Sequence, residues 1–469
     1  MKKLNELTLK EAVEGLKSKA FSSYDLTKAC LTQIDASDCE LKAFVTVLKE
    51  EALEQARTAD KTINDMGVHA LEQHSLLGVP YACKDNFSTQ GIKTTASSKM
   101  LENYFPPFES TVTTKLKKAG AVLLGKTNMD AFAHGSSTET SDFFTTKNPH
   151  DKTRSPGGSS GGSACAVASN MCIFAIGSET AGSLRGPASW CGIVGFKPTY
   201  GRVSRYGLVA MASSTDSPGS LTKTVYDGAY VLKVLAGKDP LDATTSLTLP
   251  DDYSIRGLES LKSLKIGKPK SYFKIDLEPA VRKQAENFTD LLKNLGAEIV
   301  EMNLLSPKYS IATYTILQRS EVSSNLARLD GIRYGNDRTS FGAEAKNRMM
   351  LGAYTLSAGY YDEYYAKAQK VRTLIVDDFR KAFSRVDLIV APSMPCTALK
   401  IGESQKSPIF GELMDVLAEP SSIAGLPAIS LPFGLDEKNL PIGMQFIGPQ
   451  FSEKKIIGAA SCVEELCQH

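Results

Sequence analysis

Apolar and polar residues near the N-terminus alternate with the spacing of amphipathic helices. The apolar positions of the first such segment are Leu9, Ala12, Val13 and Leu16. Thr8 and Glu11 form a possible capping box at its start, because their side chains can bind each other's free backbone N–H groups. The segment SYDLTKACLTQI follows the same pattern. We therefore predict a helical region over about residues 1–70.

The pattern changes at residue 76, where short apolar runs begin to alternate with helical segments. LLGVPYACK and AVLLGKTN have the length and composition of buried strands. STVTTKLKKAG, which lies between them, has the spacing of a helix. Such alternation predicts the α/β class, with strands gathered in one sheet.

The second half of the chain continues this alternation. VRKQAENFTDLLKNLG predicts a helix that stops at Gly296, since glycine is favoured just past a helix C-terminus. AEIVEMN, VDLIVAPSM, PAISLPFG and GMQFIG predict strands. Further helices are expected over about residues 361–383 and in FSEKKIIGAASCVEELC. Because no repeat or linker interrupts the pattern, we predict a single domain over residues 1–469.

The composition is that of an ordinary globular protein. The 469 residues carry a formal net charge of +2, with 42% hydrophobic and 23% charged residues. No strong electrostatic field is therefore expected for binding nucleic acid or anionic lipid. No run approaches the roughly 18 to 20 apolar residues of a transmembrane helix, so we expect no membrane association.

Nine cysteines occur without a C-x-x-C pair and mostly within apolar runs. This distribution indicates buried thiols in a reducing compartment. The N-terminal segment MKKLNELTLKEAVEGLKSKAF lacks the apolar run of a secretory signal, and its three glutamates argue against a mitochondrial presequence. These features leave the compartment open.

The run GGSSGGSA at residues 157–164 is the most unusual stretch of the chain. Glycines and serines at this density are typical either of a flexible linker or of a tightly built loop. The run continues directly into the apolar segment CAVASNMCIFAIG, which argues against a linker. A phosphate-binding loop is the next alternative, but its G-x-x-x-x-G-K-[ST] pattern is absent. A second small-residue turn, ETAGSLRGPA, follows downstream and could meet the first at a sheet edge.

Serine nucleophiles require a base that accepts the hydroxyl proton. Five histidines are present, and none lies in a G-x-S-x-G elbow or an H-E-x-x-H metal pair, although His134 and His150 could fold toward the serines. We therefore expect no metal site. Lys84 is the better candidate, because it ends an apolar strand where burial would lower its pKa. The alternative reading is a solvated lysine at a strand end.

Three long motifs then resemble the amidase signature family. They are GVPYACKDN, GGSSGGSACAV and GSETAGSLRGPASWCGIVGFKPTYGRVSRYGL, in that order along the chain. The similarity extends through SEVSSNLARLDGIRYG and GLPAISLP to nearly the whole chain, and it is greatest to the glutamine-hydrolysing subunits of tRNA-dependent amidotransferases. The resemblance implies an α/β fold in which helices cover both faces of a large mixed central sheet.

The resemblance also implies a Lys-Ser-Ser triad. Lys84 matches the family's base, Ser159 the bridging serine that follows a cis peptide bond, and Ser183 the nucleophile that attacks the amide. Protons would pass from Ser183 to Ser159 and from Ser159 to a neutral Lys84. The backbone N–H groups expected to form the oxyanion hole belong to Thr180, Ala181, Gly182 and Ser183 itself.

Three further positions match the family's glutamine pocket. Arg348 would bind the α-carboxylate of glutamine through two parallel hydrogen bonds, and Asp415 would bind the α-ammonium. Tyr314 would contact the substrate through its hydroxyl. Without the resemblance, each of these residues would be read as ordinary solvated surface.

The resemblance implies partners as well. A second component, the B subunit of the family, would bind the misacylated tRNA, activate its glutamate with ATP and Mg²⁺, and receive the ammonia. A small third subunit would stabilise the pair. No cofactor is expected in this chain, and its near-neutral charge is consistent with tRNA binding mainly through the partner.

The chain departs from the family in the loop of the expected nucleophile. The usual S-D-T-G-G-S-I-R-Q-P is replaced by SETAGSLRGP at residues 178–187. Ala181 is tolerable only if its φ is negative, because a Cβ is disfavoured at positive φ. Glu179 adds a methylene where a tight hydrogen bond is expected. The usual N-M-D-E-F-A-M-G reads NMDAFAHG, so an acidic residue is missing at Ala131.

Two other functions remain open at this point. One is a free-standing amidase that hydrolyses a small or fatty amide, and the other is a catalytically weak scaffold subunit, suggested by the altered loop. KDNFST and LAGKDPLDATT resemble the animal mitochondrial members of the family. The mitochondrial matrix is therefore favoured as the compartment, with the bacterial cytoplasm as the alternative.

Overall fold

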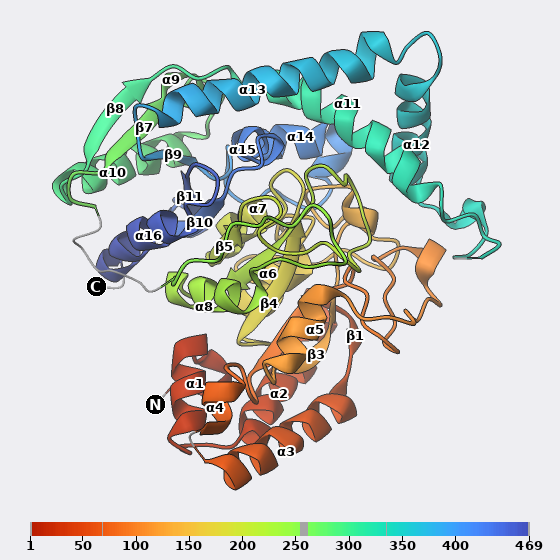
Figure 1. Cartoon of the computed structure of the whole chain (residues 1–469), viewed down its shortest axis with the longest axis vertical. Coiled ribbons are helices and arrows are strands. Elements are labelled where there is room, and N and C mark those ends of the chain that lie inside the picture. Colours follow the sequence, from red (N-terminus) through yellow and green to blue (C-terminus); the bar gives the residue numbers. More distant parts are fainter. Residues whose placement is uncertain (1, 68, 254–260, 334, 468–469) are drawn as a thin grey trace.

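A mixed sheet of 11 strands runs through the described part of the molecule (Figure 1). The computed structural model describes residues 2–67, 69–253, 261–333 and 335–467. The strands are β1 (Phe44–Val47), β2 (Pro80–Lys84), β3 (Val122–Thr127), β4 (Phe174–Glu179), β5 (Val194–Lys197), β6 (Ser217–Thr222), β7 (Lys265–Pro269), β8 (Glu298–Met302), β9 (Leu388–Pro392), β10 (Ala428–Leu435) and β11 (Pro441–Ile447). Their order across the sheet is β1-β3-β2-β4-β6-β5-β10-β11-β9-β7-β8. The predicted α/β class is confirmed.

Strand β2 lies between two parallel neighbours, β3 and β4. Tyr81 pairs with Phe174 and Cys83 with Ile176, so the carboxyl ends of β2 and β4 reach the same edge of the sheet. In parallel sheets this edge is where binding and catalytic groups collect. Lys84 closes β2 there, beside Ser178 and Glu179 at the end of β4.

Helices cover both faces of the sheet, as side-chain alternation along β11 demonstrates. Gly443 and Gln445 face α7 (Arg185–Cys191), where they contact Ser189 and Arg185. Phe446 points to the other face and packs on Phe288 of α10 (Pro279–Asn294). Successive residues of a strand alternate in direction, so α7 and α10 cover opposite faces. Three more helices pack along the sheet: α6 (Gly161–Ala168), α8 (Val225–Leu235) and α16 (Glu453–Cys467). Helix α5 (Thr111–Lys118) packs on α8.

The N-terminal region is helical, as predicted, apart from one strand. Its helices are α1 (Leu9–Lys17), α2 (Ser23–Leu41), α3 (Lys49–Met66) and α4 (His69–Gln73), which lie together at one end of the molecule (Figure 1). The capping box of α1 is confirmed, since Glu11 N donates to Thr8 Oγ1 at 3.1 Å and Thr8 N to Glu11 Oε2 at 2.8 Å. The sequence pattern did not predict strand β1, because its four residues are held by antiparallel pairing with the distant β3.

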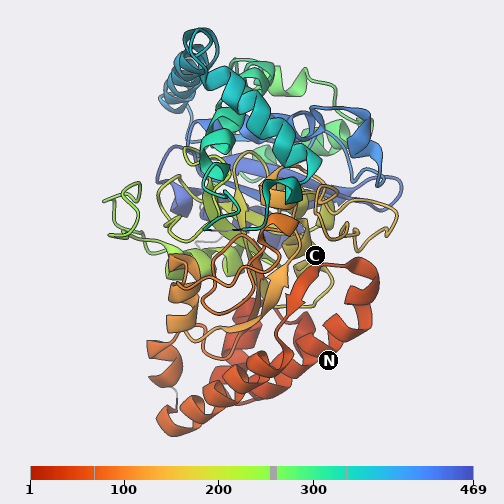
Figure 2. The same ribbon diagram turned by 90° about the vertical axis from the view of Figure 1, so that its right-hand side faces the viewer.

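The opposite end of the molecule consists of long helices (Figure 2). They are α11 (Pro307–Leu326), α12 (Ala343–Leu356) and α13 (Lys367–Phe383), the last entered through a π-helical turn at Asp362–Ala366. The predicted helix over about residues 361–383 is confirmed, whereas the sequence pattern did not identify α11 or α12. Beneath them lie α14 (Phe410–Met414), the 3-10 turn η8 (Asp415–Leu417) and α15 (Glu419–Ile423).

The remaining sequence predictions of elements are also confirmed. Helix α10 ends before Gly296, whose φ of 92° is the left-handed conformation expected of a glycine stop.

None of the described helices is long and apolar enough to cross a membrane. Strands from the first, middle and last parts of the chain share the sheet, but the single-domain assignment stays a prediction.

Phe288 provides a test of the packing between α10 and the sheet. Its side chain is fully buried, with ring centroids 4.8 Å from Phe433 and 5.4 Å from Phe446. Phe288→Ala should lower the free energy of unfolding by about 3–5 kcal/mol, because it removes these contacts and leaves a cavity. Urea denaturation measures the loss. Leu374→Ala, at a side chain 60% exposed on α13, should change it by less than about 0.5 kcal/mol. Equal losses would contradict the assigned packing.

Candidate active site

Lys84 lies inside the protein at the carboxyl end of β2. Its side chain has no exposed surface, and its Nζ lies 2.7 Å from Ser159 Oγ. The same nitrogen lies 3.1 Å from both the carbonyl oxygen and Oγ of Ser178. The alternative of a solvated lysine is therefore wrong, and the amine reaches one of the two expected serines.

Burial lowers the pKa of Lys84 to about 7, because the charged form loses its hydration. The carboxylates of Asp130, Asp216 and Glu179 act in the opposite direction. Among the described residues, none of these three carboxylates forms a hydrogen bond with Nζ. A substantial fraction of neutral amine is therefore present near pH 7.

The GGSSGGSA run forms a tight buried loop that leads into α6. The Gly158–Ser159 peptide bond is cis, as the resemblance implied, and Ser159 is fully buried. A Cβ on Gly158 would lie 2.1 Å from Asp130 Oδ2, and one on Gly162 would lie 2.4 Å from the Asn128 carbonyl oxygen. The linker alternative is therefore wrong: glycines are present because other backbone and side chains approach so closely.

The two serine-bearing loops meet as expected. Ser160 N donates to the carbonyl oxygen of Ser183 at 3.2 Å, and Ser183 is 4% exposed. Within the described ranges, no hydrogen bond joins Ser159 Oγ to Ser183 Oγ. The structure thus brings Lys84, Ser159 and the Ser183 loop together, while the relay from Ser183 to Ser159 stays a prediction.

The altered loop keeps a regular conformation. Ala181 does not have a positive φ, so its Cβ meets the condition set by the sequence. Over the parts of the chain that the structure describes, the backbone N–H groups of Ala181, Gly182 and Ser183 have no hydrogen-bond acceptor. Three successive free donors beside a serine hydroxyl are suited to binding an oxyanion.

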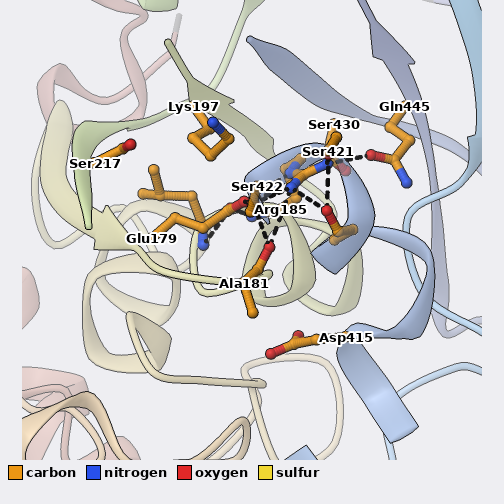
Figure 3. Close-up of polar contacts among 12 residues, drawn as sticks. Glu179, Ala181, Arg185, Lys197, Ser217, Asp415, Ser421, Ser422, Ser430 and Gln445 are labelled. Atoms are coloured by element: carbon orange, nitrogen blue, oxygen red, sulfur yellow. Dashed lines mark hydrogen bonds and ion pairs between the residues drawn. The ribbon is translucent and has the colours of Figure 1, made fainter. Parts of the chain in front are cut away.

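Glu179 and Arg185 hold this loop in place (Figure 3). Glu179 Oε2 accepts hydrogen bonds from Leu184 N at 3.0 Å and Arg185 N at 3.2 Å, and Oε1 accepts from Arg185 Nε at 3.0 Å. Burial is the largest single influence and opposes ionisation of Glu179, but the charge and hydrogen bonds of Arg185, the Lys197 charge and the Leu184 N–H together outweigh it and lower the pKa of the carboxyl. Both carboxylate oxygens of Glu179 thus have partners in or beside the loop, so the added methylene is accommodated.

The guanidinium of Arg185 also binds groups from the far end of the chain. Its Nη1 donates to Ser421 Oγ at 2.9 Å and to Gln445 Oε1 at 2.5 Å. Its Nη2 donates to Ser422 Oγ at 2.9 Å and to the Ala181 carbonyl at 3.1 Å (Figure 3). Sequence reasoning missed this cluster, because residues 421–445 carry no motif that connects them with residue 185.

A small cavity brings the expected nucleophile and all three expected glutamine-pocket residues together. It holds about 10 Å³, so its walls are nearly in contact. The lining residues that the sequence had suggested are Ser183, Tyr314, Arg348 and Asp415. Sequence reasoning missed Ser136 and Glu412, which line it as well.

Asp415 presents an unpaired carboxylate oxygen beside this cavity. Oδ2 accepts a hydrogen bond from Ser136 Oγ at 2.9 Å, while Oδ1 has no partner among the described residues. Burial raises the pKa of Asp415 well above its usual value. Arg348 donates from Nε to Glu344 at 2.6 Å, which leaves its other nitrogens available. A carboxyl group and a guanidinium that line one cavity suit the ammonium and carboxylate ends of an amino acid.

Two larger cavities lie further out. One of about 370 Å³ adjoins the small cavity through Arg348, Gly411 and Glu412 and is lined by His134, both of whose ring nitrogens lack a partner within the described ranges. Burial lowers the pKa of His134 well below its usual value, aided by the Arg348 and Arg319 charges. The other, of about 750 Å³ between α3 and α5, contains none of the expected site residues. His150 is not at the site, since it contacts Cys191 O.

The site combines a buried lysine in contact with a buried serine, a loop of free N–H donors, and a cavity lined by Asp415 and Arg348. This combination is typical of amide-cleaving serine enzymes. The chain matches the Amidase family over residues 25–457 and belongs to it. It is 48% identical to the A subunit of the glutamyl-tRNA(Gln) amidotransferase of Desulfatibacillum aliphaticivorans, over 97% of this chain and 96% of that protein.

Solved structures agree with this family assignment. The crystal structure of the A subunit of the Thermotoga maritima glutamyl-tRNA(Gln) amidotransferase is similar with a TM-score of 0.82 and 41% identity, covering 98% of this chain and 95% of that chain. The native peptide amidase of Stenotrophomonas maltophilia is similar with a TM-score of 0.84 and 28% identity, covering 99% and 97%. The expected amidase signature fold is confirmed.

The Arg185–Glu179 pair predicts a large loss of stability when one partner is removed. Arg185→Met should lower the free energy of unfolding by about 3–5 kcal/mol, because it leaves the Glu179 charge buried and unpaired. Adding Glu179→Leu should recover part of the loss. Urea denaturation measures both. Lys293→Met, which breaks an exposed pair with Asp290, should cost at most about 1 kcal/mol. A small effect of Arg185→Met alone would contradict this role.

Proposed function

We propose that this chain is the glutamine-hydrolysing subunit of a tRNA-dependent amidotransferase. The observation that carries the proposal is the buried contact of 2.7 Å between Lys84 Nζ and Ser159 Oγ, next to the Ser183 loop. Its support from comparison is the 48% identity over nearly the whole chain with the A subunit of such an enzyme. The products of the reaction are glutamate and ammonia.

In the proposed mechanism, neutral Lys84 accepts the proton of Ser159 as Ser159 accepts the proton of Ser183. The Ser183 oxygen attacks the side-chain amide carbon of glutamine, and the N–H groups at residues 180–183 bind the oxyanion. The relayed proton is returned to the leaving nitrogen, which departs as ammonia and leaves a glutamyl ester on Ser183. Water then cleaves the ester by the reverse proton route.

Substrate selection is proposed to rest on opposite charges across the small cavity. Asp415 Oδ1, which lacks a partner in the described residues, would accept from the α-ammonium of glutamine. Arg348 would bind the α-carboxylate, and Tyr314 would contact the substrate between them. The present cavity volume of about 10 Å³ requires its walls to move apart when glutamine enters.

The proposal includes partners and a compartment. A second subunit would bind the tRNA and use ATP and Mg²⁺ to activate its glutamate, and a small third subunit would complete the complex; this chain would need no cofactor. The relatives described above are bacterial, at up to 48% identity, which supports the bacterial cytoplasm over the mitochondrial matrix favoured by the sequence. We therefore propose the bacterial compartment.

The two alternatives have different support. A free-standing amidase is consistent with the structural similarity to a peptide amidase at 28% identity. The scaffold alternative rested on the altered loop, and the contacts of Glu179 described above weaken that reason.

Glutamine hydrolysis by the wild type, with and without the co-expressed partner subunit, separates these functions. We expect ammonia release that depends on the partner and falls at least a thousandfold in Ser183→Ala and Lys84→Ala, since both would remove covalent catalysis. Release that is equal without the partner would favour the free-standing amidase. Absence of release from the wild type would favour the scaffold.

The pH profile should follow the ionisation of Lys84. The reactive form is the neutral amine, so kcat/KM should rise with pH, bend near the Lys84 pKa of about 7 and remain level above it. Glutamine hydrolysis measured from about pH 5.5 to 9 tests this. A rate that still rises tenfold per pH unit between about pH 8 and 9 would indicate a base with an ordinary lysine pKa.

Asp415→Asn should affect substrates unequally. Loss of the charge opposite the α-ammonium should raise KM for glutamine about tenfold to a hundredfold, because a hydrogen bond between charged groups is lost. Steady-state kinetics with glutamine and with butyramide, which lacks both α-groups, provide the comparison. Equal loss with the two amides would show that Asp415 acts on the fold or the chemistry rather than on recognition.

A further inference from the structure

Three oxygens surround the amine of Lys84, and their number matches the protons of its charged form. Nζ lies 2.7 Å from Ser159 Oγ, 3.1 Å from Ser178 Oγ and 3.1 Å from the Ser178 carbonyl oxygen. A charged ammonium has three N–H donors and satisfies all three oxygens. The protonated state is therefore complete with no further partner.

When Lys84 is neutral, either of two hydroxyl groups can donate a hydrogen bond to its lone pair. The neutral amine has two N–H donors and one lone pair, so one of the three oxygens must supply a proton instead of receiving one. The Ser178 carbonyl can only accept, which leaves the hydroxyls of Ser159 and Ser178 as competing donors. Only the Ser159 proton leads to the relay in the proposed function. A Ser178 proton on the lone pair would block the base.

Asn86 contacts the competing hydroxyl. Its side-chain amide nitrogen lies 2.9 Å from Ser178 Oγ, and both residues are buried, at 2% and 4% exposure. The other amide atom, Asn86 Oδ1, has no partner within the described ranges. Val209 N donates to the Asn86 carbonyl at 2.8 Å and fixes the backbone beside Lys84. A half-turn of the amide would exchange its two ends and place the carbonyl against Ser178.

We propose that Asn86 and Ser178 are positioning residues that select which proton Lys84 receives. In the neutral state, the amide carbonyl of Asn86 accepts the Ser178 proton, and Ser178 Oγ in turn accepts from Nζ. The lone pair of Lys84 then faces Ser159 alone. The inference rests on the proposed function for its kinetic consequence, but the proton arrangement itself does not depend on the substrate.

Hydrogen-bond counting alone makes this selection necessary. A carboxylate in contact with Nζ would keep the amine charged, but Asp130, Asp216 and Glu179 act only at longer range, from other elements. Ser160 Oγ also donates to the Ser178 carbonyl, at 3.1 Å, so that oxygen remains an acceptor. The Ser178 hydroxyl is thus the group that competes with Ser159 for the lone pair, and Asn86 contacts it on the side away from Lys84.

A double-mutant cycle tests the selection through kcat for glutamine hydrolysis by the complex with its partner subunit. Asn86→Leu should lower kcat about tenfold to a hundredfold, with KM within about twofold, because the Ser178 proton then competes for the lone pair. Ser178→Ala should cost less, since no competing donor remains. The double variant should have a higher kcat than Asn86→Leu alone. Losses that multiply in the double variant would overturn the proposal.

Asn86→Asp serves as the conservative variant. Its carboxylate also accepts the Ser178 proton, so kcat at its optimal pH should exceed that of Asn86→Leu by at least about tenfold. The added negative charge should also move the rise of the pH profile to higher pH. An Asn86→Asp variant that folds but remains as slow as Asn86→Leu would contradict proton selection.

Neutron diffraction from the deuterated protein provides a readout independent of activity. At a pD of about 9, where Lys84 is neutral, the Ser178 deuteron should point to Asn86 and the Ser159 deuteron to Nζ. A Ser178 deuteron on Nζ would overturn the proposal. If the expected arrangement is seen but glutamine is not hydrolysed, the proposed function fails and the proton selection stands.

Discussion

The site depends on a lysine amine that is removed from water without being paired to a carboxylate. A buried charge is costly unless it is paired, so an isolated buried lysine loses its proton near neutral pH. Lys84 is held in this state because β2 is a central strand with parallel neighbours on both sides. A contact with a carboxylate would have stabilised the ammonium and removed the base.

Burial alone does not make such an amine useful. Lys197 is also buried, and burial lowers its pKa to about 7 as well. Its Nζ, however, has only the Pro198 carbonyl as a hydrogen-bond partner among the described residues, at 3.2 Å. A carbonyl has no proton to give. The difference between the two lysines is the hydroxyl of Ser159, which the glycine-rich loop brings to Lys84 alone.

The second requirement is a rigid loop for the nucleophile, and it is linked to the substrate cavity. A Cβ on Gly182 would lie 2.2 Å from Asp415 Oδ1, so the backbone of the loop is in contact with the carboxylate that faces the cavity. Arg185 fixes the same loop to Ser421 and Gln445. The backbone N–H donors of the Ser183 loop and the carboxylate of Asp415 are therefore positioned by the same packed residues, not by separate flexible segments.

Local patterns in the sequence identified part of the helices and strands, because capping, periodicity and glycine stops act over a few residues. The buried end of β2 and the glycine-rich loop were recognisable for the same reason, and the likeness of long motifs pointed to Tyr314, Arg348 and Asp415, which the small cavity brings together with Ser183. Strand β1 and the Arg185 cluster were not recognisable, since each depends on partners far along the chain. The burial of Lys84, the contact of Asn86 with Ser178 and the absence of a positive φ at Ala181 became visible in the folded chain alone. Burial and hydrogen-bond partnership are properties of neighbours in space, which spacing along a chain does not specify.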